Sequence, residues 1–218
     1  MDLTTQHVEI HDVSRVILKD YGQLFITQGE EEALRIEASE DVLRTIKASV
    51  YEGELTLDID AGWFDKTMHF LGGAFDGRNL KYYLTIRHLD SIFVSGAARV
   101  KMSGLKTESV YVTLKGAGEL IISNIEAGLV DVDLPGAGII SLSGKTDTLK
   151  ARLKGAGSLD APQLESREAR VSLKGVGKAS VWANYQLDAH VDGVGAIEYR
   201  GNPEVRQSVS GLGSVNKR

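Results

Sequence analysis

The sequence repeats one short pattern at nearly constant spacing: an apolar residue, one variable residue, then two glycines separated by a single residue. It reads LKGAG at 114–118 and 153–157, LPGAG at 134–138, LKGVG at 173–177, VDGVG at 191–195 and VSGLG at 209–213, with a weaker SGAA at 95–98. The first glycines of these seven units are Gly96, Gly116, Gly136, Gly155, Gly175, Gly193 and Gly211, and the last two steps are slightly shorter than the others. A period near 20 is typical of a solenoid, in which each repeat stacks on its neighbours.

The residues around each glycine pair alternate between apolar and polar. When the units are aligned, the position two residues before the first glycine is always apolar, and the position four residues before it is mostly apolar. A third apolar column follows the turn. The residue between the first two columns is mostly polar. The columns are Val94, Leu114, Leu134, Leu153, Leu173, Val191 and Val209; Ile92, Val112, Val132, Ala151, Val171, Ala189 and Gln207; and Val100, Leu120, Ile140, Leu159, Ala179, Ile197 and Val215. Period-two alternation indicates half-buried strands. The sequence therefore predicts an all-β fold, a parallel β-solenoid with like residues stacked about 4.8 Å apart.

The glycine pairs have a structural interpretation in this fold. We expect them to form the corners of the rungs, where glycine can adopt a positive φ, and the residue between them to point into a crowded corner. The corner glycines are Gly96, Gly116, Gly118, Gly136, Gly138, Gly155, Gly157, Gly175, Gly177, Gly193, Gly195, Gly211 and Gly213. A second, weaker corner is expected at Gly104, Asn124, Gly144 and Gly201. Phosphate binding is disfavoured, because a dinucleotide loop needs a following helix and these segments lack helical periodicity.

Residues 1–90 are less regular than residues 91–218, which carry the repeats. Strand-like runs occur at 13–18, 23–27, 33–38, 53–60 and 80–89, separated by turn signals. A short helix is expected within 39–49, with Ser39 as a possible N-cap. We predict that residues 1–90 continue or cap the solenoid within one continuous domain, because uncovered terminal strands would leave unpaired edges that promote aggregation.

Composition excludes several classes of function. The 218 residues carry a net charge of −5, which gives no basic surface for nucleic acid. Without cysteine the chain has neither disulfides nor thiolate chemistry. No apolar run approaches the roughly 20 residues of a transmembrane helix. The first residues have no recognisable signal peptide, so a native start at Met1 would predict a cytoplasmic protein.

With these columns in view, the chain resembles the head GIN domain family of auto-transporter adhesins. The resemblance rests on LKYYLTIRHLDSIFVSGAARV at 80–100, on the LKGAG-like units, and on YRGNPEVRQSVSGLGSV at 199–215. It implies a right-handed solenoid and a non-enzymatic bacterial surface or envelope protein, without catalytic residues or a cofactor. Adhesion and lipid binding are both proposed for such proteins, so the implied ligand is an unspecified protein, glycan or lipid. The implied location is extracytoplasmic.

The segment 61–79 interrupts the strand pattern and is rich in aromatic side chains. Its candidate contact residues are Trp63, Phe64, Met68, Phe70, Leu71 and Phe75. One interpretation is that they fold over the solenoid as a cap. The other is an exposed apolar patch for a partner, a lipid or a second subunit, since clustered aromatic side chains make strong interface anchors.

Two other groups of side chains have residue types found in metal sites or in catalytic sites. His7, Glu9 and His11 would share one strand face, but no fourth group has the spacing of a metal site. Asp131 and Asp133, near Asp147 or Asp160, could resemble the aspartates of solenoid enzymes that cleave acidic polysaccharides, although outward charges on a solenoid are usually solvated surface.

We therefore favour a non-catalytic binding or adhesion module. A self-associating scaffold, assembling through the solenoid ends or the aromatic segment, is the alternative, and a polysaccharide-active enzyme is less favoured.

Overall fold

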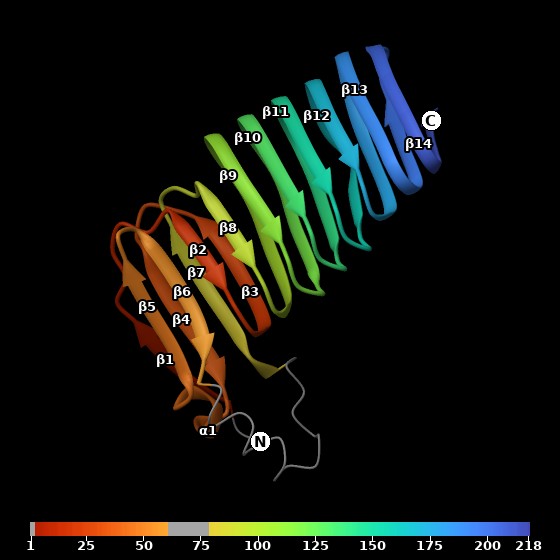
Figure 1. Cartoon of the computed structure of the whole chain (residues 1–218). Helices are drawn as coiled ribbons and strands as arrows, with labels where there is room; N and C mark the ends of the chain where they lie inside the picture. The colour runs from red at the N-terminus through yellow and green to blue at the C-terminus, as the bar shows by residue number, and fades with distance from the viewer. Residues whose placement is uncertain (1–2, 61–78) are drawn as a thin grey trace.

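The computed structural model describes residues 3–60 and 79–218 and is an elongated stack of strands (Figure 1). Its elements are β1 (Thr4–Val8), β2 (Arg15–Leu18), β3 (Tyr21–Gln28), β4 (Ala33–Ala38), α1 (Glu40–Leu43), β5 (Ile46–Tyr51), β6 (Glu54–Ile59), β7 (Lys81–Ile86), β8 (Ser91–Val94), β9 (Ala97–Leu114), β10 (Glu119–Leu134), β11 (Ile139–Leu153), β12 (Ser158–Leu173), β13 (Val176–Arg200) and β14 (Glu204–Lys217). The parallel β-solenoid predicted from the repeats is confirmed, with about six turns.

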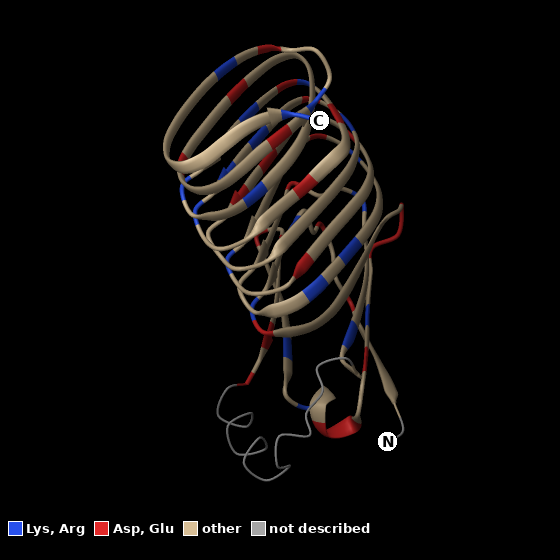
Figure 2. Cartoon of the chain, turned by 90° about the vertical axis from the view of Figure 1, so that its right-hand side faces the viewer, with Lys and Arg blue, Asp and Glu red and all other residues tan. Residues whose placement is uncertain are grey.

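Strands β9 to β14 stack in sequence order, each parallel to the next. Seen from the end, each rung is a flattened loop (Figure 2). One broad face precedes the G-x-G corner and the other follows it, and a narrow side joins the two at the far edge. The three predicted apolar columns point inward, and their members are at most 2% exposed in every rung before β14. This continuous column is the core, because no single rung could bury its own apolar face.

The corner glycines have a different physical cause from the one expected. Only two of the thirteen, Gly195 and Gly211, have a positive φ in the left-handed range. What the corner demands is close approach between rungs: a Cβ on Gly116 would lie 1.9 Å from the carbonyl oxygen of Gly96, and one on Gly175 would lie 1.9 Å from that of Gly155. The left-handed conformation belongs to the weaker corner, where Gly104, Asn124, Gly144 and Gly201 all have positive φ.

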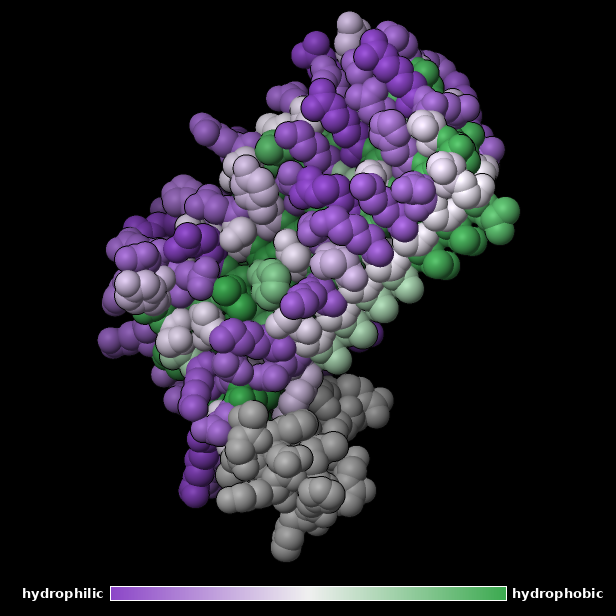
Figure 3. All heavy atoms as spheres, viewed as in Figure 1, coloured by the Kyte–Doolittle hydropathy of each residue, from purple (hydrophilic) through white to green (hydrophobic). Residues whose placement is uncertain are grey.

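The expected orientation of the residue between the paired glycines is wrong. These residues point outward instead of into a crowded corner, with Val176 59% exposed and Leu212 80% exposed. The column consists of Ala117, Ala137, Ala156, Val176, Val194 and Leu212, all of them exposed. Figure 3 shows it as a band along one long edge that turns from white and pale green to green toward the C-terminal end. The crowding comes from the neighbouring backbone, so it falls on the glycines alone.

The N-terminal strands extend the parallel pairing and then change direction. Strand β2 pairs in parallel with β6 and β8, and β3 pairs in parallel with β7 and β9. Strands β1, β4 and β5 pair antiparallel with their neighbours. The predicted helix within 39–49 is only the single turn α1, and from Ile46 onward the chain is β5. Ser39 occupies the N-cap position but its side chain makes no capping hydrogen bond.

Candidate functional site

The sequence-predicted aromatic contact residues, Trp63, Phe64, Met68, Phe70, Leu71 and Phe75, lie outside the described residues, and their role stays a prediction. Within residues 3–60 and 79–218 no group of three or more His, Asp or Glu side chains is arranged to hold a metal ion. The outward aspartates are held in ion pairs: Arg152 Nη2 lies 2.6 Å from Asp131 Oδ1, and Lys154 Nζ lies 3.0 Å from Asp133 Oδ1.

A ladder of alternating charges crosses the rungs at the narrow side. Its register is Lys106, Glu126, Lys145, Glu165 and then Trp182. Lys106 and Glu126 approach to 3.8 Å, and Lys145 and Glu165 to 4.0 Å. The next lysine in this alternation is replaced by an aromatic ring. The ladder therefore ends on a partly exposed tryptophan close to the C-terminal end of the stack.

The shortening of the last rungs hollows the surface beside this tryptophan. In the register of β12 with β13, Ala161 pairs with Val181 and Glu165 pairs with Trp182, so the residues 162–164 have no counterparts in β13. The result is a groove of about 570 Å³, within the size range of small-ligand sites. Its lining residues are Trp182, Asn184, Arg200, Gly201, Asn202 and Arg218, which we call the Trp182 groove.

Hydrogen bonds fix the orientation of the side chains that line the Trp182 groove. The Trp182 indole Nε1 donates to Asn184 Oδ1 at 2.9 Å, and Asn184 Nδ2 donates to Glu165 Oε1 at 2.9 Å. Arg200 Nη1 donates to the Pro162 carbonyl oxygen at 3.3 Å. Because each of these partners is itself anchored, the groove presents its ring and amide in a set arrangement, which lowers the entropic cost of binding a ligand.

The charge of the Trp182 groove is positive. Arg200 and Arg218 line it, and its lining residues include no Asp or Glu. Arg218 Nη1 lies 3.7 Å from Glu198 Oε2. A hydrogen bond from Lys178 lowers the pKa of Glu198, so this carboxylate stays ionised beside Arg218 at neutral pH. A planar guanidinium can bind a carboxylate through two hydrogen bonds, and an indole face stacks on the apolar face of a ring.

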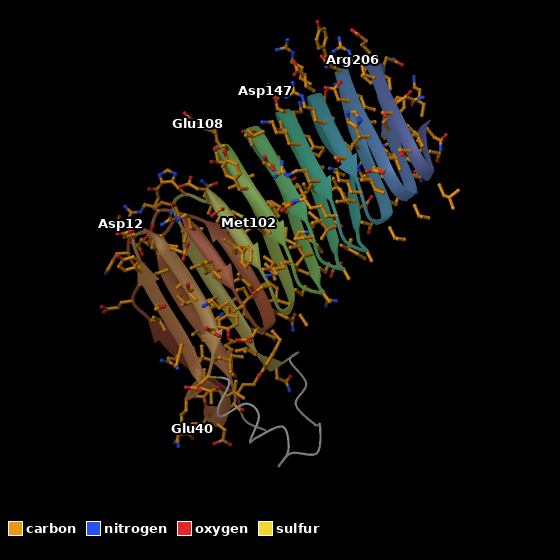
Figure 4. The ribbon with its side chains drawn as sticks, in the orientation of Figure 1. Asp12, Glu40, Met102, Glu108, Asp147 and Arg206 are labelled. Carbon is orange, nitrogen blue, oxygen red and sulfur yellow. The ribbon has the colours of Figure 1, made fainter. Side chains whose placement is uncertain are left out.

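A second hollow of about 560 Å³ continues along the narrow side and shares Asn184 with the Trp182 groove. Lys145 and Arg167 line it together with Glu126, Asp147 and Glu165, so its charge is mixed. Tyr185 is 61% exposed and the Arg167 guanidinium lies 5.3 Å from the centre of its ring. Figure 4 labels Glu108 and Asp147 on the edge that carries this hollow. Together the two hollows form an elongated surface suited to an extended ligand.

Sequence reasoning missed Trp182, although a signal for it exists. A tryptophan occupies an outward slot that four preceding rungs fill with Lys or Glu. That signal appears only after the narrow sides of successive rungs are aligned. The glycine corners alone do not fix this alignment, because the rungs differ in length at the narrow side.

A separate cluster of titratable groups lies at the N-terminal end, around Asp20 and Asp58. The Ile59 amide donates to Asp20 Oδ2 at 2.8 Å and to Asp58 Oδ1 at 2.9 Å. Burial and a hydrogen bond with Asp58 raise the pKa of Asp20, while Asp58, despite its own desolvation, has its pKa lowered by hydrogen bonds from Asp20 and Lys19. Burial also raises the pKa of Tyr82, whose hydroxyl has no hydrogen-bond partner among the described residues. We treat this cluster as structural.

Comparisons with known proteins identify the fold. A family described as "Putative auto-transporter adhesin, head GIN domain" matches residues 13–203. The chain is similar to the crystal structure of a putative adhesin from Bacteroides fragilis, at 23% identity and a TM-score of 0.88, covering 100% of this chain and 97% of that one. A putative lipid binding protein from Parabacteroides distasonis has 22% identity and a TM-score of 0.73, with the same coverage.

A putative adhesin from Parabacteroides merdae has 20% identity and a TM-score of 0.61, covering 99% of this chain and 96% of that one. At these identities the likeness concerns the fold. The comparison with curated proteins gave no match. In the described part of the chain no helix has the length and apolar character needed to span a membrane.

Proposed function

Since this chain belongs to the head GIN domain family, we propose that it is a non-catalytic binding module of the bacterial envelope that holds an acidic glycan in the Trp182 groove. The observation that carries the proposal is the oriented Trp182 indole beside Arg200 and Arg218. A sugar ring carrying a carboxylate matches both parts, because its apolar face can stack on the indole while its carboxylate accepts hydrogen bonds from a guanidinium.

The second hollow supports a chain-like ligand over a single small molecule. It continues from Asn184 along the narrow side. Beside its lining residue Arg167, the exposed Tyr185 offers a second ring. The stacked rungs hold these groups on a rigid scaffold. Because little conformational entropy is then lost on binding, even a shallow site can bind a ligand. No bond-breaking step is assigned, and the aspartates Asp131 and Asp133 serve as ion-pair partners of the basic side chains on the next rung.

Tryptophan fluorescence tests the proposal directly. The chain has two tryptophans, Trp63 and Trp182, so a Trp63→Phe variant reports on Trp182 alone. Titration with oligogalacturonate should quench or shift this emission, and neutral galacto-oligosaccharides of the same length should act at least ~10-fold more weakly, which corresponds to about 1.4 kcal/mol.

Two substitutions separate the groove from the rest of the surface. Arg200→Gln should weaken oligogalacturonate binding, while Arg99→Gln, an exposed arginine on a broad face paired with Glu119, should not. Equal binding of charged and neutral oligosaccharides would contradict the role of the arginines. Binding to phosphatidylcholine or phosphatidylglycerol vesicles without any oligosaccharide binding would instead support a lipid ligand and overturn the proposal.

The envelope location has its own test. We propose an extracytoplasmic location because the family description names an auto-transporter adhesin. Fractionation of the source cells should place the protein outside the cytoplasmic membrane; recovery in the cytoplasmic fraction alone would contradict this.

A further inference from the structure

Large apolar side chains are exposed in a line along the G-x-G corner. Ile139 and Val194 are each 47% exposed, Val176 is 59% exposed and Leu212 is 80% exposed. We call these four residues the apolar crest. They lie on five consecutive rungs, the second of which carries Ala156. With rungs about 4.8 Å apart, the apolar crest extends over roughly 19 Å.

The apolar crest protrudes because of the glycines that surround it. Val176, Val194 and Leu212 each stand between two glycines, so no neighbouring side chain along the chain shields them. Figure 3 shows the green residues of this edge projecting from the molecule near its C-terminal end. A small-molecule site is usually concave and encloses its ligand. A straight, convex line of aliphatic side chains suits an extended surface instead.

The backbone of the apolar crest is already hydrogen-bonded within the solenoid. The amide of Ile139 donates to the carbonyl oxygen of Gly118 at 2.9 Å. The amides of Val176 and Val194 donate in the same way to the preceding rung, each at 3.0 Å. Unpaired backbone groups are costly in an apolar environment. The ladder therefore allows these residues to leave water without exposing unpaired amides to hydrocarbon.

Lysines border the apolar crest. Lys115, Lys154 and Lys174 occupy the position before the first glycine of their rungs, and Lys178 follows the second glycine of its rung. All four are exposed. Asp192 is the acid at the same position in a later rung. The corner therefore carries local positive charge although the whole chain has a net charge of −5.

Two of these lysines have partners and two do not. Lys154 Nζ lies 3.0 Å from Asp133 Oδ1, and Lys178 Nζ lies 2.6 Å from Glu198 Oε1. Among the described residues the other two lysines have no carboxylate partner. Their ammonium groups are therefore available to an anionic partner.

A shallow hollow of about 330 Å³ lies where the apolar and basic side chains meet. Ile139 and Val176 line it, and Lys178 alone is charged among its described lining residues. An apolar group that enters this hollow has a cation beside it. The hollow thus repeats on a small scale the chemistry of the whole corner.

We propose that the apolar crest and its lysines dock on the surface of a bilayer that contains anionic lipids. The aliphatic side chains enter the boundary between headgroups and acyl chains, where interfacial elements bury their apolar faces about 5–10 Å deep. The lysine stems lie along this boundary and bring their ammonium groups to lipid phosphates. Because the crest side chains are largest toward Leu212, the C-terminal end enters deepest.

The composition of this edge favours a lipid surface over a protein partner. Protein interfaces are enriched in aromatic side chains and arginine and depleted in lysine, whereas this edge combines aliphatic side chains with lysines. An ammonium group binds a phosphate as a point charge and needs no fixed partner geometry. The Trp182 groove lies on the narrow side, at the far edge of each rung, so docking would leave it facing away from the bilayer. The proposal does not depend on the ligand of that groove.

Flotation with vesicles tests the docking. The wild-type chain should bind vesicles of phosphatidylcholine mixed with phosphatidylglycerol at least ~10-fold more tightly than vesicles of phosphatidylcholine alone, and added salt should weaken this binding. Lys174→Gln should weaken it about 5-fold, while the control Lys106→Gln on the narrow side should not. Val176→Ser combined with Leu212→Ser should weaken binding at least ~10-fold with unchanged far-UV circular dichroism.

The absence of cysteine from the sequence allows the docking edge to be mapped. Val176→Cys labelled with an environment-sensitive fluorophore should show a blue-shifted, brighter emission when phosphatidylglycerol vesicles are added. The matched label at Asp147→Cys, on the far edge, should show no change. Equal shifts at both positions would overturn the assignment of the apolar crest as the membrane contact.

The remaining outcomes separate this proposal from the glycan site. Failure to bind phosphatidylglycerol vesicles, with oligogalacturonate binding intact, overturns the docking proposal alone. Vesicle binding without oligogalacturonate binding overturns only the glycan proposal. Vesicle binding that is insensitive to both Lys174→Gln and the double serine variant overturns the placement on this edge. Self-association in sedimentation equilibrium that the double serine variant abolishes, without vesicle binding, would assign the apolar crest to a second copy and overturn the proposal.

Discussion

The close approach of successive rungs makes a sharp prediction for Gly155→Ala. A Cβ at this position would lie 2.0 Å from the carbonyl oxygen of Gly136, far inside the 3.4 Å at which ordinary contact begins. The obstructing atom is backbone, so no side-chain rotation can relieve the overlap. The rungs must separate locally, and this strains two hydrogen bonds, Ala156 N–H to Gly136 O at 3.1 Å and Gly155 N–H to Leu134 O at 3.3 Å.

The energetic cost follows from these contacts. Overpacking costs about 1–3 kcal/mol, and each weakened hydrogen bond adds up to about 1 kcal/mol. We expect a destabilisation of roughly 3 kcal/mol, which corresponds to a Tm lowered by about 6–12 °C for a chain of this size. The neighbouring substitution Ala156→Val is the control, because the same exposed slot already holds Val176 and Val194 in later rungs.

Thermal and urea unfolding followed by circular dichroism measure the difference between the two variants. If Gly155→Ala unfolds within about 0.5 kcal/mol of Ala156→Val, which is the usual spread of surface substitutions, the glycine corner is not required by close approach and the reasoning fails. A large effect confined to Gly155→Ala would also separate this cause from left-handed backbone conformation, because Gly155 does not have a positive φ.

Three further predictions concern the interior and the acidic cluster. Asp20→Asn should stabilise the protein at pH 7, and the gain should shrink as the pH falls. Burial raises the pKa of Asp20, so the wild-type protein loses stability as the pH rises through that pKa, whereas the variant does not. Urea midpoints of both proteins from pH 3 to 8 measure the difference, and a difference independent of pH would contradict the raised pKa. Tyr82→Phe should change stability by between zero and a gain of about 1 kcal/mol, since it removes a buried hydroxyl without a partner in the described structure, and a clear loss on thermal unfolding would mean that the hydroxyl is bonded. Leu134→Ala should lower the unfolding free energy by about 2–5 kcal/mol, because this side chain is 0% exposed between two like rungs. A loss of less than about 1 kcal/mol in urea unfolding would contradict the packed column.

Much of the fold follows from the sequence because the stacking is nearly periodic. Once the units are aligned on their glycine pairs, alternation identifies the inward columns of both broad faces, and the structure confirms them from Val94 to Ile197. Periodicity cannot reveal why the glycines are needed. A positive φ and a backbone contact both select glycine, and only the distance from Gly175 to the rung beneath distinguishes them.

The candidate site was less predictable because it arises where the period breaks. The groove forms beside β13, whose rung lacks the counterparts of residues 162–164, and Trp182 occupies a slot that is charged elsewhere. The sequence shows that the step from Gly175 to Gly193 is shorter than the one before it, but it does not show on which side of the rung the residues are missing. The G-x-G corner keeps its spacing to the strand before it, so the deletion falls on the narrow side.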